Sequence, residues 1–236
     1  MTKFIFITGG VVSSLGKEFI SEAFVSLLRS KGLKVQIKSL DPYFNLTSKS
    51  KNESTTSGQI FSNVLKKERQ GGYLGETVQI IPHITNEIKD FILKNKKIDK
   101  DGMKSEYDYI LCEIGGTVGD MEGFPFIEAI RQLRNELGRE RVMFIHLTFI
   151  PFLSAASEYK TKPTQHSVKE LLKLGIQPDV LLCRCDKILT DESKKKISLF
   201  CNIPEQSVIS VVDVEKVHER AYWVVKLDIE VKNYFK

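Results

Sequence analysis

The chain has 236 residues and a mass of 26.9 kDa, with 42% hydrophobic and 28% charged residues, and this excludes disordered, collagen-like and disulfide-scaffold chains. No apolar run is long enough to cross a bilayer, and the start of the chain lacks the pattern of a signal peptide. The net charge of +5 is too small to indicate a nucleic-acid-binding protein. We therefore expect a cytoplasmic protein that binds neither nucleic acid nor membrane.

Strand-like and helix-like segments alternate along the chain. The first apolar run, at residues 4–8, is β-branched and is followed by glycines, which predicts a buried strand. The predicted elements that follow are a helix at 18–30, a strand in KVQIKSLD, a loop at 49–58, helices at 59–68 and in NEIKDFILKNKK, a solvated connection in KNKKIDKDGMK, a strand in YDYILCEIGG, a helix at 126–137, a strand in VMFIHLTFIPFL, a helix in SVKELLKLG, and strands in DVLLCRC and SVISVVDV.

This alternation predicts an α/β protein whose mostly parallel sheet has helices on both faces. We find no repeat and no linker, so we expect a single domain over residues 1–236. Polar clusters follow five of the predicted strands. Because the carboxyl ends of parallel strands lie at one edge of the sheet, these clusters are expected to gather there, where ligands bind in such folds.

The first cluster is GGVVSSLGK, from Gly9 to Lys17, between a strand and a helix. Glycines let backbone N–H groups approach phosphate oxygens, and Lys17 adds a full charge. The spacing departs from the standard P-loop, because Gly10 is one residue too far from Gly16 and Glu18 replaces the Ser or Thr that holds magnesium. The alternative is a glycine turn with a surface lysine.

The second cluster runs from Glu113 to Glu122. An acid directly after a buried strand, with glycines behind it, is a common way to present a carboxylate to Mg²⁺ on phosphates. Alternatively, Asp120 and Glu122 cap the helix that follows. The third cluster, KTKPTQH from Lys160 to His166, suits a phosphorylated ligand with a polar ring, or is a plain loop before a helix.

Other candidate residues point to structural roles. His146 lies in an apolar strand and is expected to be a core histidine with satisfied nitrogens. The cysteines have no partners at metal-ligand spacing and are expected to be reduced, buried thiols; they are Cys112, Cys183, Cys185 and Cys201.

Several long motifs, spread between about residues 3 and 214, together resemble the amidoligase (synthetase) domain of the CTP synthase family. They are GGVVSSLGK, LDPYFN, KERQGGYLGETVQIIPHIT, EIGGTVGDMEGFPFIEAIRQL, KTKPTQHSVKELLKLGIQPD and KISLFCNIPEQSVIS. The resemblance implies a P-loop-like three-layer sandwich. It also implies a ligase that uses ATP and Mg²⁺ to join ammonia to UTP, with CTP as product and feedback ligand.

The resemblance also implies roles for individual residues. Lys17 and Lys38 are the expected catalytic residues, and Glu113 is the expected metal ligand. The expected ATP-binding residues are Ser14, Leu15, Gly16, Lys17, Arg184 and Asp213. The expected UTP- or CTP-binding residues are Ser13, Asp120, Met121, Glu122, Lys160, Thr161, Lys162, Pro163, Thr164, Gln165 and Lys196.

The chain departs from the family pattern at three places. Glu18 follows Lys17 where the family has glycine. The family's second catalytic lysine aligns with Ser39, and the nearest lysine is Lys38, which on a strand faces the opposite side of the sheet. Only residues 46–54 stand where the family has a longer stretch with a further acidic magnesium ligand.

The family's glutaminase domain has no counterpart in this sequence, so the nitrogen source is expected to be free ammonia or a separate glutaminase. A homotetramer with the UTP site between subunits is also implied. Two functions remain open: a working synthetase, favoured by the intact EIGGTVGD and KTKPTQHS segments, and a catalytically impaired pseudoenzyme that binds nucleotides or partner subunits, favoured by the departures.

Overall fold

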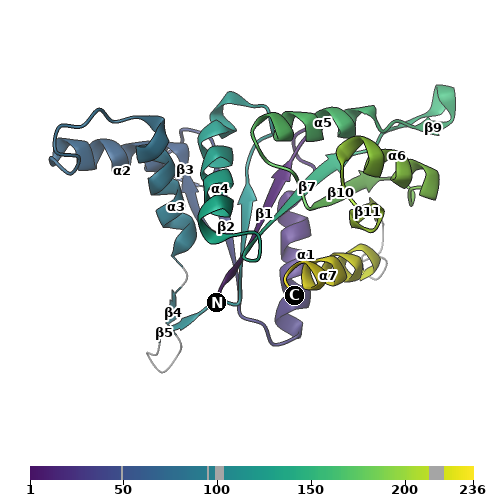
Figure 1. The fold of residues 1–236 in the computed structure, drawn as a ribbon, viewed down its shortest axis with the longest axis horizontal. Coiled ribbons are helices and arrows are strands. Elements are labelled where there is room, and N and C mark those ends of the chain that lie inside the picture. The colour runs from purple at the N-terminus through teal and green to yellow at the C-terminus, as the bar shows by residue number, and fades with distance from the viewer. Residues whose placement is uncertain (49, 95, 99–103, 213–220) are drawn as a thin grey trace.

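The computed structural model describes residues 1–48, 50–94, 96–98, 104–212 and 221–236. Within these residues, seven strands form one sheet in the order β11-β10-β7-β1-β6-β2-β3, and every neighbouring pair is parallel (Figure 1). The strands are β1 (Lys3–Gly9), β2 (Val35–Asp41), β3 (Glu53–Thr56), β6 (Tyr109–Ile114), β7 (Val142–Phe149), β10 (Val180–Cys185) and β11 (Val208–Val212). The predicted parallel α/β sheet is confirmed.

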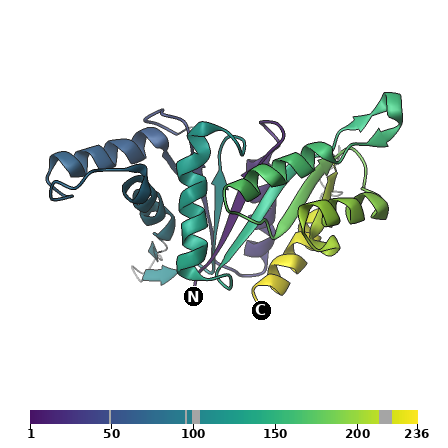
Figure 2. The same ribbon diagram turned by 45° about the horizontal axis from the view of Figure 1, so that its top comes forward.

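Helices cover both faces of the sheet (Figure 2). The helices are α1 (Lys17–Ser30), α2 (Ser57–Arg69), α3 (Thr85–Leu93), α4 (Phe124–Leu137), α5 (Lys162–Lys173), α6 (Asp191–Cys201) and α7 (Ala221–Tyr234). The short helical turns are η1 (Ile80–Ile84), η2 (Met121–Gly123), η3 (Ser154–Ala156) and η4 (Glu205–Ser207). Two small antiparallel strand pairs lie outside the sheet: β4 (Lys96–Ile98) with β5 (Lys104–Glu106), and β8 (Phe152–Leu153) with β9 (Glu158–Tyr159).

The alternation of side chains along a strand creates two cores. In β1, Ile5 and Ile7 join the core under α1 and α7, while Phe4 and Phe6 join the core under α2, α3 and α4. A third core lies under α5 and α6. Because β1 is central and buried on both faces, its sequence is a continuous apolar run, as expected for a parallel strand.

The structure differs from the predicted elements in several places. The polar stretch 49–58 contains the edge strand β3, which tolerates polar residues because it pairs with β2 along one side only. Helix α5 begins at Lys162, so KPTQH is helical, with its proline in the first turn where no N–H partner is needed. Helices α6 and α7 were not predicted. None of the helices in the described residues has the length and apolarity needed to span a membrane.

Candidate functional site

The loop between β1 and α1 has an unusual backbone. Val11, Ser14 and Gly16 all have left-handed conformations, with φ of 77°, 60° and 86°. Left-handed non-glycine residues are uncommon and each costs on the order of 1–3 kcal/mol, which is typical of ligand-binding loops. At Gly10 a Cβ would lie 1.6 Å from the Ser167 hydroxyl, so a side chain there would displace Ser167. Gly10 therefore packs closely against α5.

Lys17 is the first residue of α1, and its side chain folds back over the end of β1. Its ammonium donates a hydrogen bond to the carbonyl of Gly116, at 2.8 Å. A Cβ on Gly9 would lie 2.9 Å from the same ammonium, so the glycine makes room for it. Burial lowers the pKa of Lys17, while the charges of Glu113 and Asp120 act in the opposite direction.

Glu113 is the second charged residue at this edge and lies on β6, opposite Ile7 of β1. Its side chain is only 4% exposed, and its buried Oε1 atom has no hydrogen-bond partner among the described residues. Burial raises the pKa of Glu113 to about 7, and the carboxylates of Glu18 and Glu22 also raise it, against the effects of Ser21 and Lys17. A buried carboxylate oxygen without a partner is suited to a cation ligand.

Lys17 and Glu113 line one cavity of about 580 Å³, which we call the Lys17 cavity. Its remaining walls come from the loop before α1, the end of β2 and the segment that leads to β3; they are Ser14, Leu15, Gly16, Glu18, Ser39, Leu40, Asp41, Tyr43, Ser48, Ser50 and Gly115. The structure thus brings the predicted phosphate-loop residues and the predicted metal ligand to the same site.

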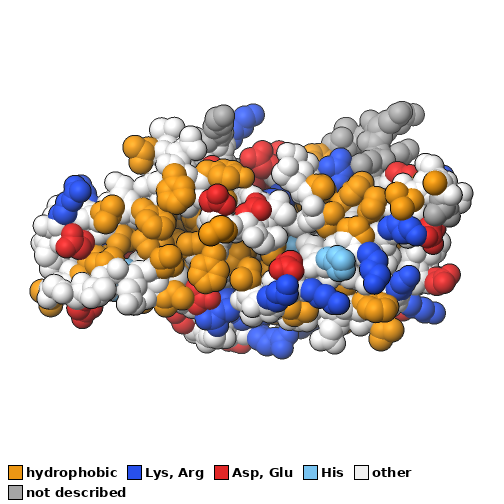
Figure 3. All heavy atoms as spheres, turned by 90° about the horizontal axis from the view of Figure 1, so that it is seen from above, with side chains coloured by type: hydrophobic (Ala, Val, Ile, Leu, Met, Phe, Trp, Pro, Cys, Tyr) orange, Lys and Arg blue, Asp and Glu red, His pale blue; other side chains and the backbone are white. Residues whose placement is uncertain are grey.

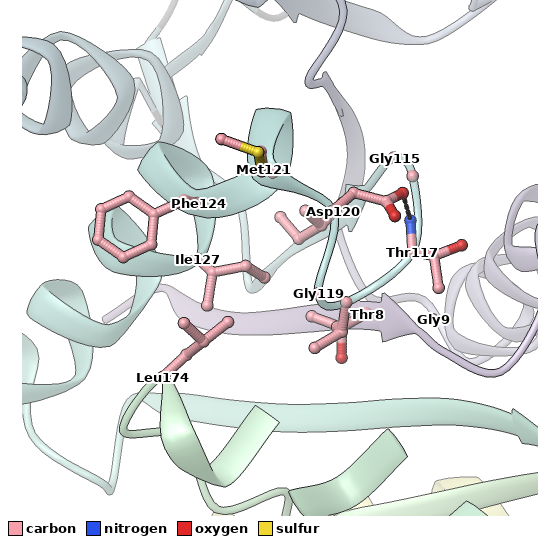
Figure 4. A pocket seen from close by; sticks show the side chains of 14 residues that line it. Thr8, Gly9, Gly115, Thr117, Gly119, Asp120, Met121, Phe124, Ile127 and Leu174 are labelled. Carbon is pink, nitrogen blue, oxygen red and sulfur yellow. Dashed lines mark hydrogen bonds between the residues drawn. The ribbon is translucent and has the colours of Figure 1, made fainter. Parts of the chain in front are cut away.

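A second cavity of about 370 Å³, which we call the Asp120 cavity, lies on the other side of the same edge (Figure 4). It is walled by the glycine-rich segment 114–121, and its floor is apolar, with Ile127 and Leu174. The Asp120 carboxylate accepts a hydrogen bond from the backbone N–H of Thr117, at 2.9 Å, which closes the turn. Asp120 and Met121 line this cavity, whereas Glu122 and Ser13 are exposed outside it.

The two cavities meet at Gly115, which lines both. The ammonium of Lys17 lies at this junction, since Gly9 and Gly116, which it contacts, line the Asp120 cavity. Lys17 therefore lines one cavity and contacts two glycines in the wall of the other.

Arg184 contacts the loop between β1 and α1. Its guanidinium donates to the carbonyl of Leu15, at 3.0 Å, and therefore braces the backbone just before α1. Asp213, the other residue expected near the ATP base, lies outside the described residues.

The segment from Lys160 to Gln165 divides into buried and exposed side chains. Thr161, Thr164 and Gln165 are buried and bonded internally; for example, the Thr164 hydroxyl donates to that of Thr148, at 3.0 Å. Lys162 is exposed, Pro163 is half-buried, and Lys160 is half-buried and bonded to Glu158. Lys196 is exposed on α6. The structure does not bring these residues into either cavity.

Lys38 does not reach the Lys17 cavity. Its side chain is fully buried on the opposite face of β2, where its ammonium donates to the carbonyls of Phe91, Ile92 and Lys94 at 2.7, 3.2 and 2.6 Å. Ser39 takes the cavity side instead and accepts a hydrogen bond from Ser50, at 3.0 Å. The alternation of side chains along a strand separates the two residues.

His146 is fully buried and both ring nitrogens have partners, as expected of a core histidine. Nδ1 meets the Thr8 hydroxyl at 2.8 Å and Nε2 meets the Ser167 hydroxyl at 2.7 Å. Burial lowers the pKa of His146 to about 3, and the charge of Lys17 acts the same way, so the ring is neutral. All four cysteines are free and buried, as predicted.

Sequence reasoning missed two serines of the cavity wall, Ser48 and Ser50. Ser48 and Ser50 lie in a polar segment without periodicity, and nothing in the sequence distinguishes them from neighbouring polar residues. Ser39 could be found from the sequence, because it stands where the family has its second catalytic lysine. Its neighbour on the strand, Lys38, is expected to face the opposite side of the sheet.

The chain matches the family model described as the N-terminus of CTP synthase over residues 3–50 and 47–232. The two matched segments meet at residues 47–50, the part of the chain that includes Ser48 and Ser50. In the solved structures, a plasmid partition protein from Borrelia burgdorferi is similar in fold only, with a TM-score of 0.51 and 13% identity over 99% of this chain and 100% of the other.

Curated relatives are far more similar in sequence. CTP synthase of Pelagibacter ubique is 45% identical over 272 residues, which cover 100% of this chain and 49% of the relative. CTP synthase of Oleidesulfovibrio alaskensis is 50% identical over 252 residues, which cover 92% of this chain and 45% of the relative. The chain therefore spans about half the length of these relatives. It belongs to the CTP synthase family and corresponds to the N-terminal, synthetase region of that family.

Proposed function

We propose that this chain aminates UTP to CTP at the expense of ATP, with ammonia as the nitrogen source. The observation that carries the proposal is the position of the Lys17 ammonium at the junction of the two cavities. A cation at this point can neutralise a phosphoryl group while it passes from a ligand in one cavity to a ligand in the other. Family membership suggests which ligands these are.

On the ATP side, the triphosphate would lie in the Lys17 cavity against the loop before α1. Backbone N–H groups of Ser14, Leu15 and Gly16 and the helix N-terminus offer donors and partial positive charge to phosphate oxygens. Lys17 would exchange its bond to the Gly116 carbonyl for a phosphate oxygen. Arg184 would act through Leu15, whose carbonyl it holds, and Asp213 would contact the base side of ATP.

Glu113 fits the magnesium ligand that the family implies. Its Oε1 atom is buried, lies in the cavity wall and has no partner among the described residues, and carboxylate oxygen is the donor type that Mg²⁺ prefers. When bound, Mg²⁺ would neutralise charge on the β- and γ-phosphates. Glu113 itself would hold the cation beside Lys17.

On the UTP side, the Asp120 cavity would take the pyrimidine nucleotide, with Asp120 and Met121 in contact. The γ-phosphoryl group of ATP would pass to O4 of uracil, releasing ADP; ammonia would then attack C4, and the phosphate would leave. Further UTP or CTP contacts are proposed from residues exposed at or near this edge and from the start of α5: Ser13, Glu122, Lys160, Thr161, Lys162, Pro163, Thr164, Gln165 and Lys196. A homotetramer that holds the nucleotide between subunits would use them.

The test is CTP formation from UTP, ATP, MgCl₂ and ammonium chloride, followed by anion-exchange chromatography. We expect CTP to form with ammonium chloride. A parallel reaction with glutamine in place of ammonium chloride tests whether this chain needs a separate glutaminase. Lys17→Met is expected to lower the rate about 100-fold or more, because a charge at the transferring phosphoryl is lost. Lys173→Met, an exposed lysine on α5, serves as the control and is expected to retain full activity. Absence of CTP from the unaltered chain contradicts the proposal.

A second candidate is a nucleotide-binding module without catalysis. The observation that favours it is that Ser39 faces the cavity while Lys38 faces the opposite side of β2. Lys17 is then the one ammonium among the described residues that line the Lys17 cavity. Tight binding of UTP and of AMPPNP, an ATP analogue that does not transfer its phosphoryl group, without CTP formation, would support the module.

A further inference from the structure

The described residues of the Lys17 cavity carry more carboxyl groups than ammonium groups. Among the described residues that line it, Glu18, Asp41 and Glu113 have carboxyl groups, and Lys17 has the one ammonium. A triphosphate that enters such a cavity meets net repulsion unless cations enter with it. A cation that accompanies an anionic ligand would therefore favour its binding in this cavity.

Glu18 is placed to meet that cation. It is the second residue of α1, directly after Lys17, and its exposed side chain lines the cavity. Glu22, one turn further along the helix, is also exposed but does not line the cavity. The two acids thus differ in position although they lie on one helix.

An independent observation comes from Glu113. Its side chain is 4% exposed, it lines the same cavity, and its Oε1 atom has no hydrogen-bond partner among the described residues. A buried oxygen without a partner costs free energy unless a ligand satisfies it. Glu18 from α1 and Glu113 from β6 therefore line the same cavity.

The break in the family match lies at the same cavity. The two matched segments meet at residues 47–50, and Ser48 and Ser50 form part of the cavity wall. The alignment with the relative from Pelagibacter ubique runs over 272 residues, although the chain has 236. The alignment therefore includes residues of the relative that have no counterpart in this chain.

We propose that Glu18 is a second carboxylate ligand, beside Glu113, of a divalent cation that enters the Lys17 cavity together with the nucleotide triphosphate. The inference rests on the proposed function, because it requires a triphosphate in this cavity. Magnesium is commonly held by one or two carboxylates together with phosphate oxygens and water. In the described part of the chain no three His, Cys, Asp or Glu side chains form a metal site by themselves.

The test measures binding of AMPPNP by titration calorimetry, with MgCl₂ and separately with EDTA. The unaltered chain is expected to bind AMPPNP more tightly with Mg²⁺. Glu18→Gln is expected to weaken binding roughly 10-fold or more in MgCl₂, since a metal ligand is lost, and to strengthen it in EDTA, since a negative charge near phosphate is removed. Glu22→Gln is the matched control and is expected to change binding little in either buffer.

A second readout uses Mn²⁺, whose free form gives a paramagnetic resonance signal. In the presence of AMPPNP, the unaltered chain and the Glu22→Gln variant are expected to bind Mn²⁺ equally, and Glu18→Gln more weakly.

The inference is overturned if Glu18→Gln strengthens AMPPNP binding in both buffers. That result would mean that Glu18 only repels the phosphates and does not bind a cation. It is also overturned if Glu22→Gln weakens binding as much as Glu18→Gln does. If AMPPNP binds equally with and without Mg²⁺, only this inference fails. If AMPPNP does not bind under either condition, the proposed function fails with it.

Discussion

Glu113 makes the stability of the metal-free chain depend on pH. The pKa of Glu113 is raised from 4.5 to about 7, and burial is the largest cause of this shift. Between these values the folded chain keeps a proton that the unfolded chain has already released. The contribution of Glu113 to the free energy of unfolding therefore falls as the pH rises through this window, by up to about 3 kcal/mol. The site gives up stability to hold a carboxylate where a cation can bind.

Glu113→Gln is expected to remove this dependence, because glutamine stays neutral. In EDTA, the variant should match the unaltered chain near pH 4.5 and have a free energy of unfolding up to about 3 kcal/mol higher at pH 8, as measured by urea denaturation. Glu68→Gln, at an exposed acid on α2, serves as the control and is expected to change the pH dependence little. A difference between Glu113→Gln and the unaltered chain that does not vary with pH would contradict this explanation.

At the scale of elements, strand β2 shows how a shift of one residue changes a role. Val35 and Ile37 face the core under α1, and Ser39 continues this face into the Lys17 cavity. Lys38 faces the other way and satisfies three carbonyls at the end of helix α3, which otherwise have no intrahelical donor. In this structure Lys38 connects β2 to α3 through hydrogen bonds. Burial lowers the pKa of Lys38.

Lys38→Met is therefore expected to lower the free energy of unfolding by about 2–4 kcal/mol, since it leaves buried carbonyls without donors. Ser39→Ala, on the cavity side of the same strand, is expected to cost less than about 1 kcal/mol. Urea denaturation of both variants gives the comparison. If Lys38→Met were as stable as the unaltered chain and yet formed no CTP, the ammonium would belong to the catalytic site instead.

At the scale of the molecule, hydrophobic side chains gather over one half of the carboxyl edge (Figure 3). The exposed hydrophobic residues of the loop after β2, of η1 and of the start of α4 are Tyr43, Phe44, Leu46, Ile80, Ile81, Met121 and Phe124. Large exposed apolar patches are typical of interfaces. This surface is consistent with the proposed homotetramer and would place a second copy beside the Asp120 cavity.

We expect the chain to sediment as an assembly larger than a monomer at micromolar concentration. Ile80→Glu is expected to shift it toward the monomer, because a charge would be buried in the interface. Leu199→Glu is the control: Leu199 is 80% exposed on α6, toward the other end of the sheet. A monomer with and without nucleotides, or an equal effect of both variants, would remove the proposed assembly.

The sequence by itself determined most of the strands and helices along the chain and the meeting of the Lys17 and Glu113 clusters at one edge. These follow from local patterns, because apolar runs and glycines act on their own neighbours. It also indicated Lys17, at the end of the glycine-containing loop after β1, and Glu113, near the end of the buried strand β6. The start of α5 and the strand β3 were missed, because pairing and packing overrode weak local signals.

Only the tertiary structure decided what the site residues touch. Lys17 finds its partner at Gly116, 99 positions away in the chain, and Lys38 finds its carbonyls on a helix more than 50 positions on. The division of the edge into two cavities that meet at Gly115 also has no local cause. Contacts of this kind depend on which segments the sheet brings together, and that is set by the burial of the whole core rather than by any one segment.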